Sequence, residues 1–239
     1  MAPAPVRRSR GPKPTKVDPD QLLDAAQAVF AQDGLKAASL RAIARRAGCD
    51  PALIYYHFEN KEALFAALLR RRFPGMLREM EALANPEDAR STCERLWEVL
   101  LIYHRHLSDD PGIRSMIRGE IVQGTEGLAG HIEAQVFPIL GSVRRILDQG
   151  MARGDLRAEL PTLLTTFFLV RMQLEILDLL PSVLPRLMEL SPEAAVVTGM
   201  RAWFELFWRG VARDPSIPLP PLPAPAAAAP ALEIQEIHS

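Results

Sequence analysis

Residues 39–58 have the sequence Ser-Leu-Arg-Ala-Ile-Ala-Arg-Arg-Ala-Gly-Cys-Asp-Pro-Ala-Leu-Ile-Tyr-Tyr-His-Phe, and this stretch decides the fold. Ser39 is a favourable cap for a helix that ends before Gly48, and Asp50 followed by proline is typical of a second helix start. Two short helices separated by a tight turn predict a helix-turn-helix. Its second helix can enter the major groove of DNA.

The side chains of this pair divide into an inward and an outward set. Apolar residues at helical spacing are expected to pack inward: Leu40, Ile43, Ala44, Ala47, Ile54 and Phe58. The outward positions carry hydroxyl, ring and cationic groups, which suit contacts with phosphates and base edges. The sequence predicts DNA binding by Ser39, Arg41, Arg45, Pro51, Ala52, Tyr55, Tyr56, His57 and Lys61.

Lys61 adds an electrostatic argument. It follows Asn60, the expected cap of a fourth helix, so its positive charge opposes the helix dipole. That placement is unfavourable unless a phosphate lies at the helix start, held by the lysine and the free backbone N–H groups. We therefore expect Lys61 to bind a phosphate. Taken singly, each of these residues could be ordinary helix surface, and their coincidence on one face of a basic module favours DNA.

These residues and their neighbours resemble the N-terminal domain of the tetracycline-repressor (TetR) family, from Asp18 to Leu69. The matching positions are Ala25-Ala26 and Phe30 before Gly34, Ser39-x-Arg41-x-Ile43-Ala44-x-x-Ala47-Gly48, and Ile54-Tyr55-Tyr56-His57-Phe58-x-Asn60-Lys61-x-x-Leu64. The resemblance implies that four residues meet phosphates: Ser39, Tyr55, His57 and Lys61. It also implies that Arg41 and the third helix approach bases or nearby backbone. Leu53 stands where many members have a phosphate-binding threonine, so that contact is expected to be absent or replaced.

The rest of the chain shows apolar spacing typical of helices and no convincing strand. The first helix should stop near Gly34, Pro74-Gly75 should break or kink the fourth, and Pro138 should interrupt a later one. Later helices are expected at 86–107, 112–123, 128–153, 161–180 and 192–213. The predicted fold is all-α, with a three-helix helix-turn-helix domain at 18–73 and a helical effector-binding and dimerisation domain at 74–213.

The ends of the chain differ from this helical body. Residues 1–17 are rich in proline and basic residues, which predicts a disordered arm that either has no role or contacts DNA. Residues 214–239 are rich in proline and alanine, which predicts a disordered tail. Residues 1–73 hold 13 Lys and Arg against 7 Asp and Glu, whereas the remainder holds 15 against 22. This asymmetry indicates a basic module for a polyanion, joined to a domain with another task.

The composition also indicates the cellular compartment in which the protein works. Cys49 and Cys93 are too few for a disulfide framework, and each is expected to be a small packing residue. No apolar stretch reaches the roughly 18 residues of a membrane span, and the N-terminus lacks the apolar segment of a secretory signal. We therefore expect a cytoplasmic protein without a membrane partner.

The family resemblance implies a homodimer that binds a small-molecule effector. Members usually pair their last two long helices, here 161–180 and 192–213, with those of a second copy. Pairing lets two recognition helices reach major grooves roughly 34–36 Å apart on a near-palindromic operator. The effector candidates are Trp97, Tyr103, His104, Met116, Met151, Phe168, Arg171, Met172 and Glu175, although such residues are often plain core. Arg171 and Glu175 could pair with each other, pair across the dimer or orient a ligand.

Other functions fit the sequence less well. An enzyme is disfavoured because the nucleophile-elbow, dinucleotide and phosphate-loop motifs are missing, and no cofactor is expected. A metal at His104-x-His106 is disfavoured because helical residues two apart face different ways. A helical interaction protein without DNA binding leaves Arg41 and Lys61 unexplained. An activator shares the binding chemistry of a repressor, so the sequence predicts a ligand-responsive regulator, with repression as the favoured outcome.

Overall fold

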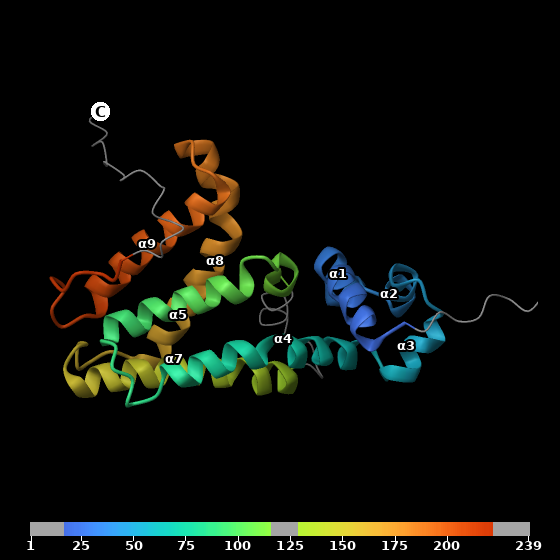
Figure 1. Ribbon diagram of the computed structural model, residues 1–239, viewed down its shortest axis with the longest axis horizontal. Helices are drawn as coiled ribbons and strands as arrows, with labels where there is room; N and C mark the ends of the chain where they lie inside the picture. Colours follow the sequence, from blue (N-terminus) through green and yellow to red (C-terminus); the bar gives the residue numbers. More distant parts are fainter. Residues whose placement is uncertain (1–16, 116–128, 222–239) are drawn as a thin grey trace, which may run out of the picture.

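The computed structural model describes residues 17–115 and 129–221. Every regular element in these ranges is an α-helix, apart from one isolated β-bridge between Leu156 and Ala212. Figure 1 shows α1, α2 and α3 gathered around one end of the long helix α4, with the remaining helices around its other end. None of the described helices is long and apolar enough to span a bilayer. The predicted arm at 1–17 lies outside the described residues except for Val17, which is buried.

The N-terminal domain consists of α1 (Pro19–Ala37), α2 (Leu40–Ala47), α3 (Pro51–His57) and the start of α4 (Lys61–Leu83). Each helix begins at a side-chain cap that accepts a backbone hydrogen bond, and the four caps are Asp18, Ser39, Asp50 and Asn60. The predicted helix starts at Ser39, Asp50 and Asn60 are therefore confirmed. Gly34 (φ 72°) and Gly48 (φ 68°) adopt left-handed conformations where the first two helices were expected to stop.

The core of this domain holds the short helices in place. Ile43, Ala44 and Ile54 are buried as predicted, while the other members of the inward set are partly buried against the same core. Phe30 of α1 meets Phe65 of α4 edge to face, with 6.0 Å between the ring centroids. Helix α3 packs on α2, α2 packs on α1, and α1 packs on α4, so the long helices anchor the short pair through α1.

Helix α4 runs unbroken through Pro74, so the predicted break at Pro74-Gly75 is wrong. A proline removes one backbone donor, but buried residues on both sides of it hold the helix on the core. Phe73, Met76 and Met80 supply this packing. The boundary expected at residues 73 and 74 therefore lies inside a helix that both domains share.

The second domain contains α5 (Thr92–Leu107), α7 (Ala129–Arg153), α8 (Thr162–Met188) and α9 (Pro192–Val211). Helix α5 starts later than expected, because Ser91 and Glu94 form a capping box there. Helix α7 continues through Pro138 and α8 continues past residue 180 through Pro181, so neither proline acts as an interruption. A further helix begins at Pro111 and is described only as far as residue 115.

Buried arginines close the C-terminal ends of two helices in this domain. Arg95 is fully buried, and its Nε donates to the carbonyl of Leu83 at the end of α4 (2.9 Å). Arg114 donates to the carbonyl of Ser108 at the end of α5 (2.8 Å) and pairs with Asp178 of α8 (2.6 Å). A cation is favourable at a helix C-terminus, so these contacts fix where α4 and α5 end.

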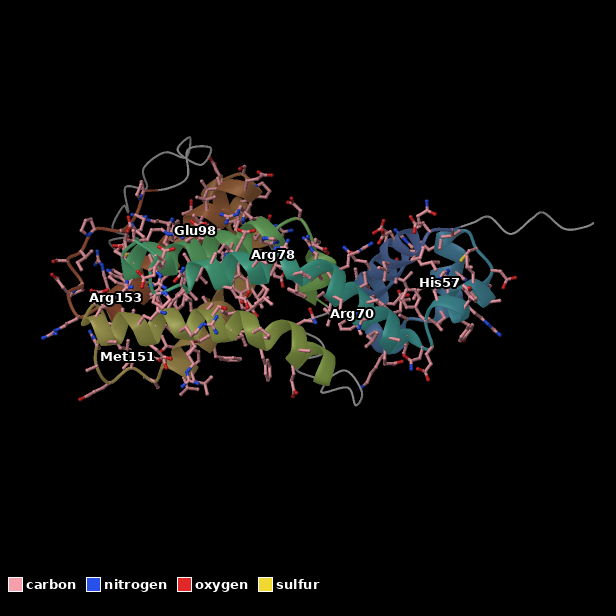
Figure 2. The ribbon with its side chains drawn as sticks, turned by 60° about the horizontal axis from the view of Figure 1, so that its bottom comes forward. His57, Arg70, Arg78, Glu98, Met151 and Arg153 are labelled. Atoms are coloured by element: carbon pink, nitrogen blue, oxygen red, sulfur yellow. The ribbon has the colours of Figure 1, made fainter. Side chains whose placement is uncertain are left out.

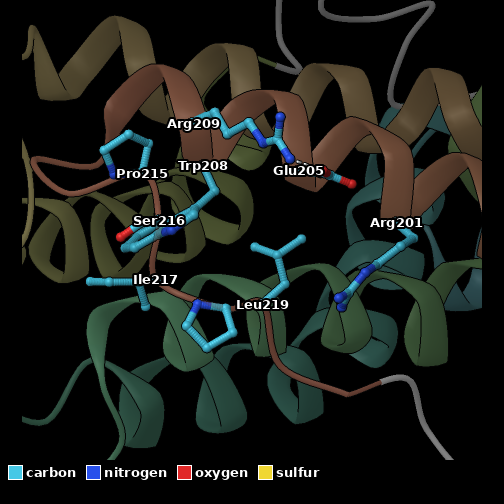
Figure 3. Close-up of a pocket in the computed structure, with 9 residues that line it drawn as sticks. Arg201, Glu205, Trp208, Arg209, Pro215, Ser216, Ile217 and Leu219 are labelled. Atoms are coloured by element: carbon cyan, nitrogen blue, oxygen red, sulfur yellow. Dashed lines mark hydrogen bonds and ion pairs between the residues drawn. The ribbon is translucent and has the colours of Figure 1, made fainter.

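The chain after α9 folds back across that helix (Figure 3). A guanidinium N–H of Arg201 donates to the carbonyl oxygen of Pro220, and Leu219 packs against the core. The guanidinium of Arg201 also lies 5.8 Å from the ring centroid of Trp97. The first part of the predicted disordered tail at 214–239 is therefore packed on the domain, and residues 222–239 lie outside the described residues.

Candidate nucleic-acid interface and effector cavity

The outward face of α3 carries two large exposed aromatic side chains. Tyr55 is 61% exposed and Tyr56 is 82% exposed. The ring of His57 packs edge to face on Tyr56, with 5.0 Å between centroids. Exposed aromatic rings with hydroxyl groups can bond to phosphates and contact base edges or sugars. The structure therefore exposes Tyr55, Tyr56 and His57 together on α3, and His57 lies at one end of the molecule (Figure 2).

The start of α3 explains why this chain has Leu53 where many family members have a threonine. Asp50 accepts from the backbone N–H of Ala52 (2.8 Å), and Pro51 occupies the first helical position. Ala52 is exposed, whereas Leu53 is partly buried against the core. Leu53 thus serves packing in place of the phosphate contact that threonine makes in many family members.

Helix α2 adds two cations next to this face. Arg41 and Arg45 lie one turn apart and are exposed, and neither forms an ion pair in the part of the chain that the structure describes. The hydroxyl of Ser39 accepts from the backbone N–H of Ala42 (3.2 Å), so its oxygen already caps the helix. Both arginines remain available to a polyanion.

Lys61 has a different partner from the one predicted. Its ammonium donates to the carbonyls of Leu35 (2.9 Å), Lys36 (2.9 Å) and Ala38 (3.5 Å). These carbonyls belong to the end of α1, where a positive charge is favourable. The expectation that only a phosphate explains the position of Lys61 is therefore wrong, because the lysine joins α4 to α1. A phosphate contact by Lys61 remains a prediction.

A buried carboxylate joins the two domains. Asp110, just before the helix at Pro111, is 8% exposed. Its Oδ2 accepts from the side-chain amide of Gln27 in α1 (2.7 Å) and lies 3.7 Å from Nε of Arg72 in α4. A second guanidinium nitrogen of Arg72 donates to the carbonyl of His106 in α5. We call Gln27, Arg72 and Asp110 the junction.

The backbones of the two domains also approach each other closely beside the junction. A Cβ atom added to Gly112 would lie 2.6 Å from the Cβ of Ala31 in α1, too close for an unshifted contact. The absence of a side chain at Gly112 therefore lets the second domain touch α1 directly. A movement of the helix that begins at Pro111 would press on the DNA-binding domain.

An apolar cavity of about 300 Å³ lies in the second domain, between α4, α5, α7 and α8. Its volume is at the lower end for a small-molecule site. The lining residues are Phe73, Met76, Tyr103, Leu107, Val136, Ile139, Leu140, Phe167, Val170, Arg171 and Leu174. An apolar interior of this kind fits the body of a hydrophobic molecule.

Two lining residues carry polar groups. Tyr103 is 4% exposed, and its hydroxyl has no hydrogen-bond partner among the described residues. Burial raises its pKa above the ordinary tyrosine value, so it stays a neutral donor and acceptor. Arg171 pairs with Glu175 at 2.7 Å, one turn further along α8. A hydroxyl that lines the cavity without a partner among the described residues suits a ligand that offers a hydrogen bond.

Among the predicted effector residues, the cavity brings together Tyr103 and Arg171 only. Trp97 packs against Phe204 instead, with 5.1 Å between ring centroids. Met151 lies at the end of the molecule opposite His57 (Figure 2). His104, Phe168, Met172 and Glu175 also do not line the cavity, and Met116 lies outside the described residues. The predicted effector residues therefore do not all line this cavity, because α5 and α8 each turn one face toward the cavity and other faces toward the core or the surface.

The remaining lining residues were missed by sequence reasoning. Phe73 and Met76 come from α4, and Val136, Ile139 and Leu140 come from α7. They are aliphatic or aromatic residues at ordinary helical spacing, indistinguishable from core in the sequence. Only the packing of α4 along α7 reveals that they face a cavity.

Helix α8 leaves a row of large apolar side chains exposed. The exposed residues are Leu163, Leu164, Phe167, Phe168, Met172, Leu179, Val183 and Leu187, joined by Leu206 of α9. Such an area is larger than isolated surface hydrophobics and typical of a binding surface. It lies in the helices that were predicted to dimerise.

Comparison with known proteins agrees with this geometry. Residues 22–68 match the sequence model described as bacterial regulatory proteins of the tetR family, which spans the whole helix-turn-helix. The fatty acid metabolism regulator protein of Bacillus subtilis is 25% identical over 140 residues, covering 57% of this chain and 70% of the relative. The transcriptional repressor KstR2 of Rhodococcus jostii is 33% identical over 97 residues, covering 40% of this chain and 46% of the relative.

The fold of both domains also has a solved counterpart. The crystal structure of the transcriptional regulator FadR from Bacillus subtilis, in complex with stearoyl-CoA, superposes with a TM-score of 0.64. It is 21% identical in sequence, and the match covers 80% of this chain and 98% of that chain. The likeness extends beyond the helix-turn-helix to the helical second domain.

Proposed function

The chain belongs to the TetR family of bacterial transcriptional regulators, and from this premise we propose that it is a ligand-released repressor. It binds a near-palindromic operator as a homodimer in the cytoplasm, and a small apolar effector lowers its affinity for that operator. The observation that carries DNA binding is the exposed pair Tyr55 and Tyr56 on α3, next to the exposed cations Arg41 and Arg45 of α2. Aromatic residues this exposed do not support the fold, which leaves recognition as their role.

The apolar row on α8 supports dimerisation. A single α3 reads only a few base pairs, whereas two related by a two-fold axis read two half-sites. The exposed residues of α8 and Leu206 of α9 supply the apolar contact that such a dimer needs.

The cavity supports an apolar effector with a polar end. Its lining is hydrophobic except for the Tyr103 hydroxyl and the Arg171 guanidinium. Molecules with a long apolar body and one oxygen-bearing group match this distribution, including fatty acids and their thioesters. The similar fatty acid metabolism regulator of Bacillus subtilis, and the FadR structure from that organism in complex with stearoyl-CoA, favour the same class.

The junction supplies a route between cavity and DNA. Helix α4 lines the cavity with Phe73 and Met76. The preceding residue of the same helix, Arg72, lies beside Asp110 of the junction. A ligand that displaces α4 or the helix at Pro111 changes how Gln27 and Arg72 hold α1. Because α1 packs against α2, the pair of recognition helices would shift relative to each other.

Selection of binding sites from genomic fragments tests the proposal. We expect recovered sites to share an approximate two-fold symmetry, with half-sites about one helical turn apart. Fatty acids, acyl-CoA thioesters and steroids are then tested for release of the protein from a recovered site. Recovery of sites without two-fold symmetry contradicts the dimer, and retention of the complex by every ligand contradicts the effector class.

A further inference from the structure

A second pocket lies between α9 and the segment of chain that follows it (Figure 3). We call residues 214–221, which run back along α9, the strap. The pocket has a volume of about 300 Å³, equal to that of the apolar cavity, and no residue lines both. Its lining residues are Arg201, Glu205, Trp208, Arg209, Pro215, Ser216, Ile217, Pro218 and Leu219. This strap pocket is therefore separate from the cavity proposed for the effector.

Specific contacts order both ends of the strap. The carboxylate of Asp214 accepts from the backbone N–H (2.9 Å) and the hydroxyl (2.6 Å) of Ser216, which fixes the turn at the start of the strap. At the other end, Leu219 packs against the core and a guanidinium N–H of Arg201 donates to the carbonyl oxygen of Pro220. The pocket thus has a helix as one wall and an anchored segment as the other.

Charged side chains of α9 leave one positive charge in the pocket without a counter-charge. Arg201, Glu205 and Arg209 follow each other one turn apart along the helix, and all three line the pocket. The carboxylate of Glu205 pairs with Arg209. Arg201 is only partly exposed and forms no ion pair with the carboxylates that the structure describes. A cation that is partly removed from water without a counter-charge favours an anion from solution.

The contacts of Arg201 orient its guanidinium but do not neutralise it. Its partners are the carbonyl oxygen of Pro220 and the ring of Trp97, whose centroid lies 5.8 Å away. A guanidinium carries several N–H donors in a planar fork, which matches two oxygens of a carboxylate or a phosphate. Figure 3 shows this side chain extending from α9 toward the strap. Arg201 is therefore suited to bind an oxyanion in the pocket.

The remaining polar groups indicate what else the ligand carries. The hydroxyl oxygen of Ser216 and the carboxylate of Glu205 can accept hydrogen bonds from hydroxyl groups of a bound molecule. The volume of the pocket is at the lower end for a small-molecule site. A long apolar chain, which suits the other cavity, does not suit a pocket that three charged residues line. These properties match a small oxyanion with hydroxyl groups, such as a hydroxy acid or a polyol phosphate.

We propose that the strap pocket is a second ligand site, which binds a small hydroxylated carboxylate or phosphate through Arg201. A ligand that contacts both Arg201 and Ser216 joins α9 to the strap and stabilises the second domain. The site needs neither the operator nor the apolar effector, so the failure of its test leaves the proposed function unaffected.

Tryptophan fluorescence gives a local readout of this site. The chain has three tryptophans, Trp97, Trp203 and Trp208, and all lie in the second domain. Trp208 lines the pocket, whereas the DNA-binding end contains no tryptophan. The purified full chain is titrated with glycerol 3-phosphate, malate and succinate at constant ionic strength. We expect saturable changes with the first two, and about fivefold weaker binding of succinate than of malate, because succinate lacks the hydroxyl group.

The set of ligands separates the possible outcomes. A saturable response to only glycerol 3-phosphate or only malate would support the site and identify its oxyanion as a phosphate or a carboxylate. Equal affinity for malate and succinate would contradict the role of the hydroxyl group. Absence of a saturable response to either, or an equal response to sodium chloride, would contradict the site itself.

Two variants of α9 should change this affinity in opposite directions. Arg201→Gln removes the free positive charge and should weaken binding at least about tenfold, as expected for a lost charge-assisted hydrogen bond. Glu205→Gln removes the nearby negative charge but keeps an acceptor oxygen, so binding should strengthen about threefold. Loosening of the strap cannot strengthen binding, so Glu205→Gln remains informative even if Arg201→Gln fails to fold. Thermal unfolding without ligand is measured for both variants.

Two further variants serve as controls. Arg186 is exposed on α8 and lines neither the strap pocket nor the apolar cavity, so Arg186→Gln should bind glycerol 3-phosphate as the unmodified chain does. Arg41→Gln controls for binding of the same anion at the DNA-binding end and should also leave the fluorescence titration unchanged. Unchanged affinity in both α9 variants, or a loss caused by Arg41→Gln and not by Arg201→Gln, would overturn the strap pocket as an oxyanion site.

Discussion

The helix-turn-helix lies at the start of α4, whereas the apolar cavity lies beside the middle of that helix, at Phe73 and Met76. The two regions differ in how clearly their function can be recognised from the sequence. The DNA-binding residues are exposed, polar or aromatic, and contained in one stretch of chain around α2 and α3. The cavity is apolar and is assembled from α4, α5, α7 and α8. A recognition surface is thus marked by residues that the fold does not need, whereas a cavity is built from the same residue types as the core.

The largest expected effect is on operator affinity and comes from the exposed residues of α3. The double variant Tyr55→Ala, Tyr56→Ala should lower operator affinity about 100-fold or more, because each lost base or phosphate contact contributes roughly 1–3 kcal/mol. Thermal unfolding should be unchanged, since both rings are exposed. Fluorescence anisotropy with a labelled operator measures the affinity. Arg153→Ala, at the far end of the molecule, is the control and should bind normally.

Operator binding retained by the tyrosine variant would remove α3 as the recognition helix. Loss of binding together with a lowered unfolding temperature would instead assign the two rings to the fold.

The sequence predicts the helix-turn-helix better than the cavity, because the first is contained in one stretch of chain and the second is assembled from distant helices. Ser39, Gly48 and Asp50 are local signals, and the structure confirms the helices that they delimit. Pro74 is also local, but the packing of Phe73 and Met76 overrides it. Long-range contacts leave no such trace in the sequence.

For Lys61, the sequence correctly indicated an unfavourable charge at a helix start but predicted the wrong partner for that charge. Its charge does oppose the dipole of α4, as the sequence indicates. Its partners are carbonyls of α1, more than twenty residues away along the chain, and only the folded structure places them within reach. In the cavity, Tyr103 and Arg171 were found because they are polar, whereas Val170 and Ile139 offered no signal.

The next effect concerns the stability of the DNA-binding end. Lys61→Met removes the ammonium that holds the end of α1, and we expect the free energy of unfolding to fall by about 2 kcal/mol. Chemical denaturation of the purified protein measures this change. Glu62→Met, at the neighbouring position of α4, is a matched control.

The salt dependence of operator binding shows whether Lys61 has a second role. A slope lowered by about one unit in the variant would add a phosphate contact to the capping role. Unchanged stability of Lys61→Met would contradict the capping account.

A smaller effect is expected where the two regions meet. Gln27→Ala removes the α1 side of the junction and should lower stability by only about 1 kcal/mol. The change in operator affinity caused by the effector should shrink, because Asp110 no longer holds α1. Coupling of this kind typically corresponds to a 5–150-fold change in affinity. Gln32→Ala, an exposed change on the same helix, is the control. Undiminished release by Gln27→Ala would exclude the junction as the route.

The smallest expected effect is inside the cavity. Tyr103→Phe keeps the ring and removes the unpartnered hydroxyl, so affinity for an effector with a polar group should fall about fivefold, equivalent to about 1 kcal/mol. Isothermal titration calorimetry with a fatty acid measures the change. Equal affinity of both proteins would show that the hydroxyl does not contact the ligand.

Release of operator DNA by the effector tests the central claim that the cavity controls the DNA-binding end. Val170→Trp fills the cavity, while Val170→Ile leaves most of it open and serves as the matched control. Anisotropy of a labelled operator is followed as a fatty acid or acyl-CoA is added to each protein. We predict that the unmodified chain and Val170→Ile release the DNA, whereas Val170→Trp binds the operator normally and keeps it at ligand concentrations on the order of 10–200-fold higher. Release of DNA from Val170→Trp at the same ligand concentration as from the unmodified chain would contradict the account.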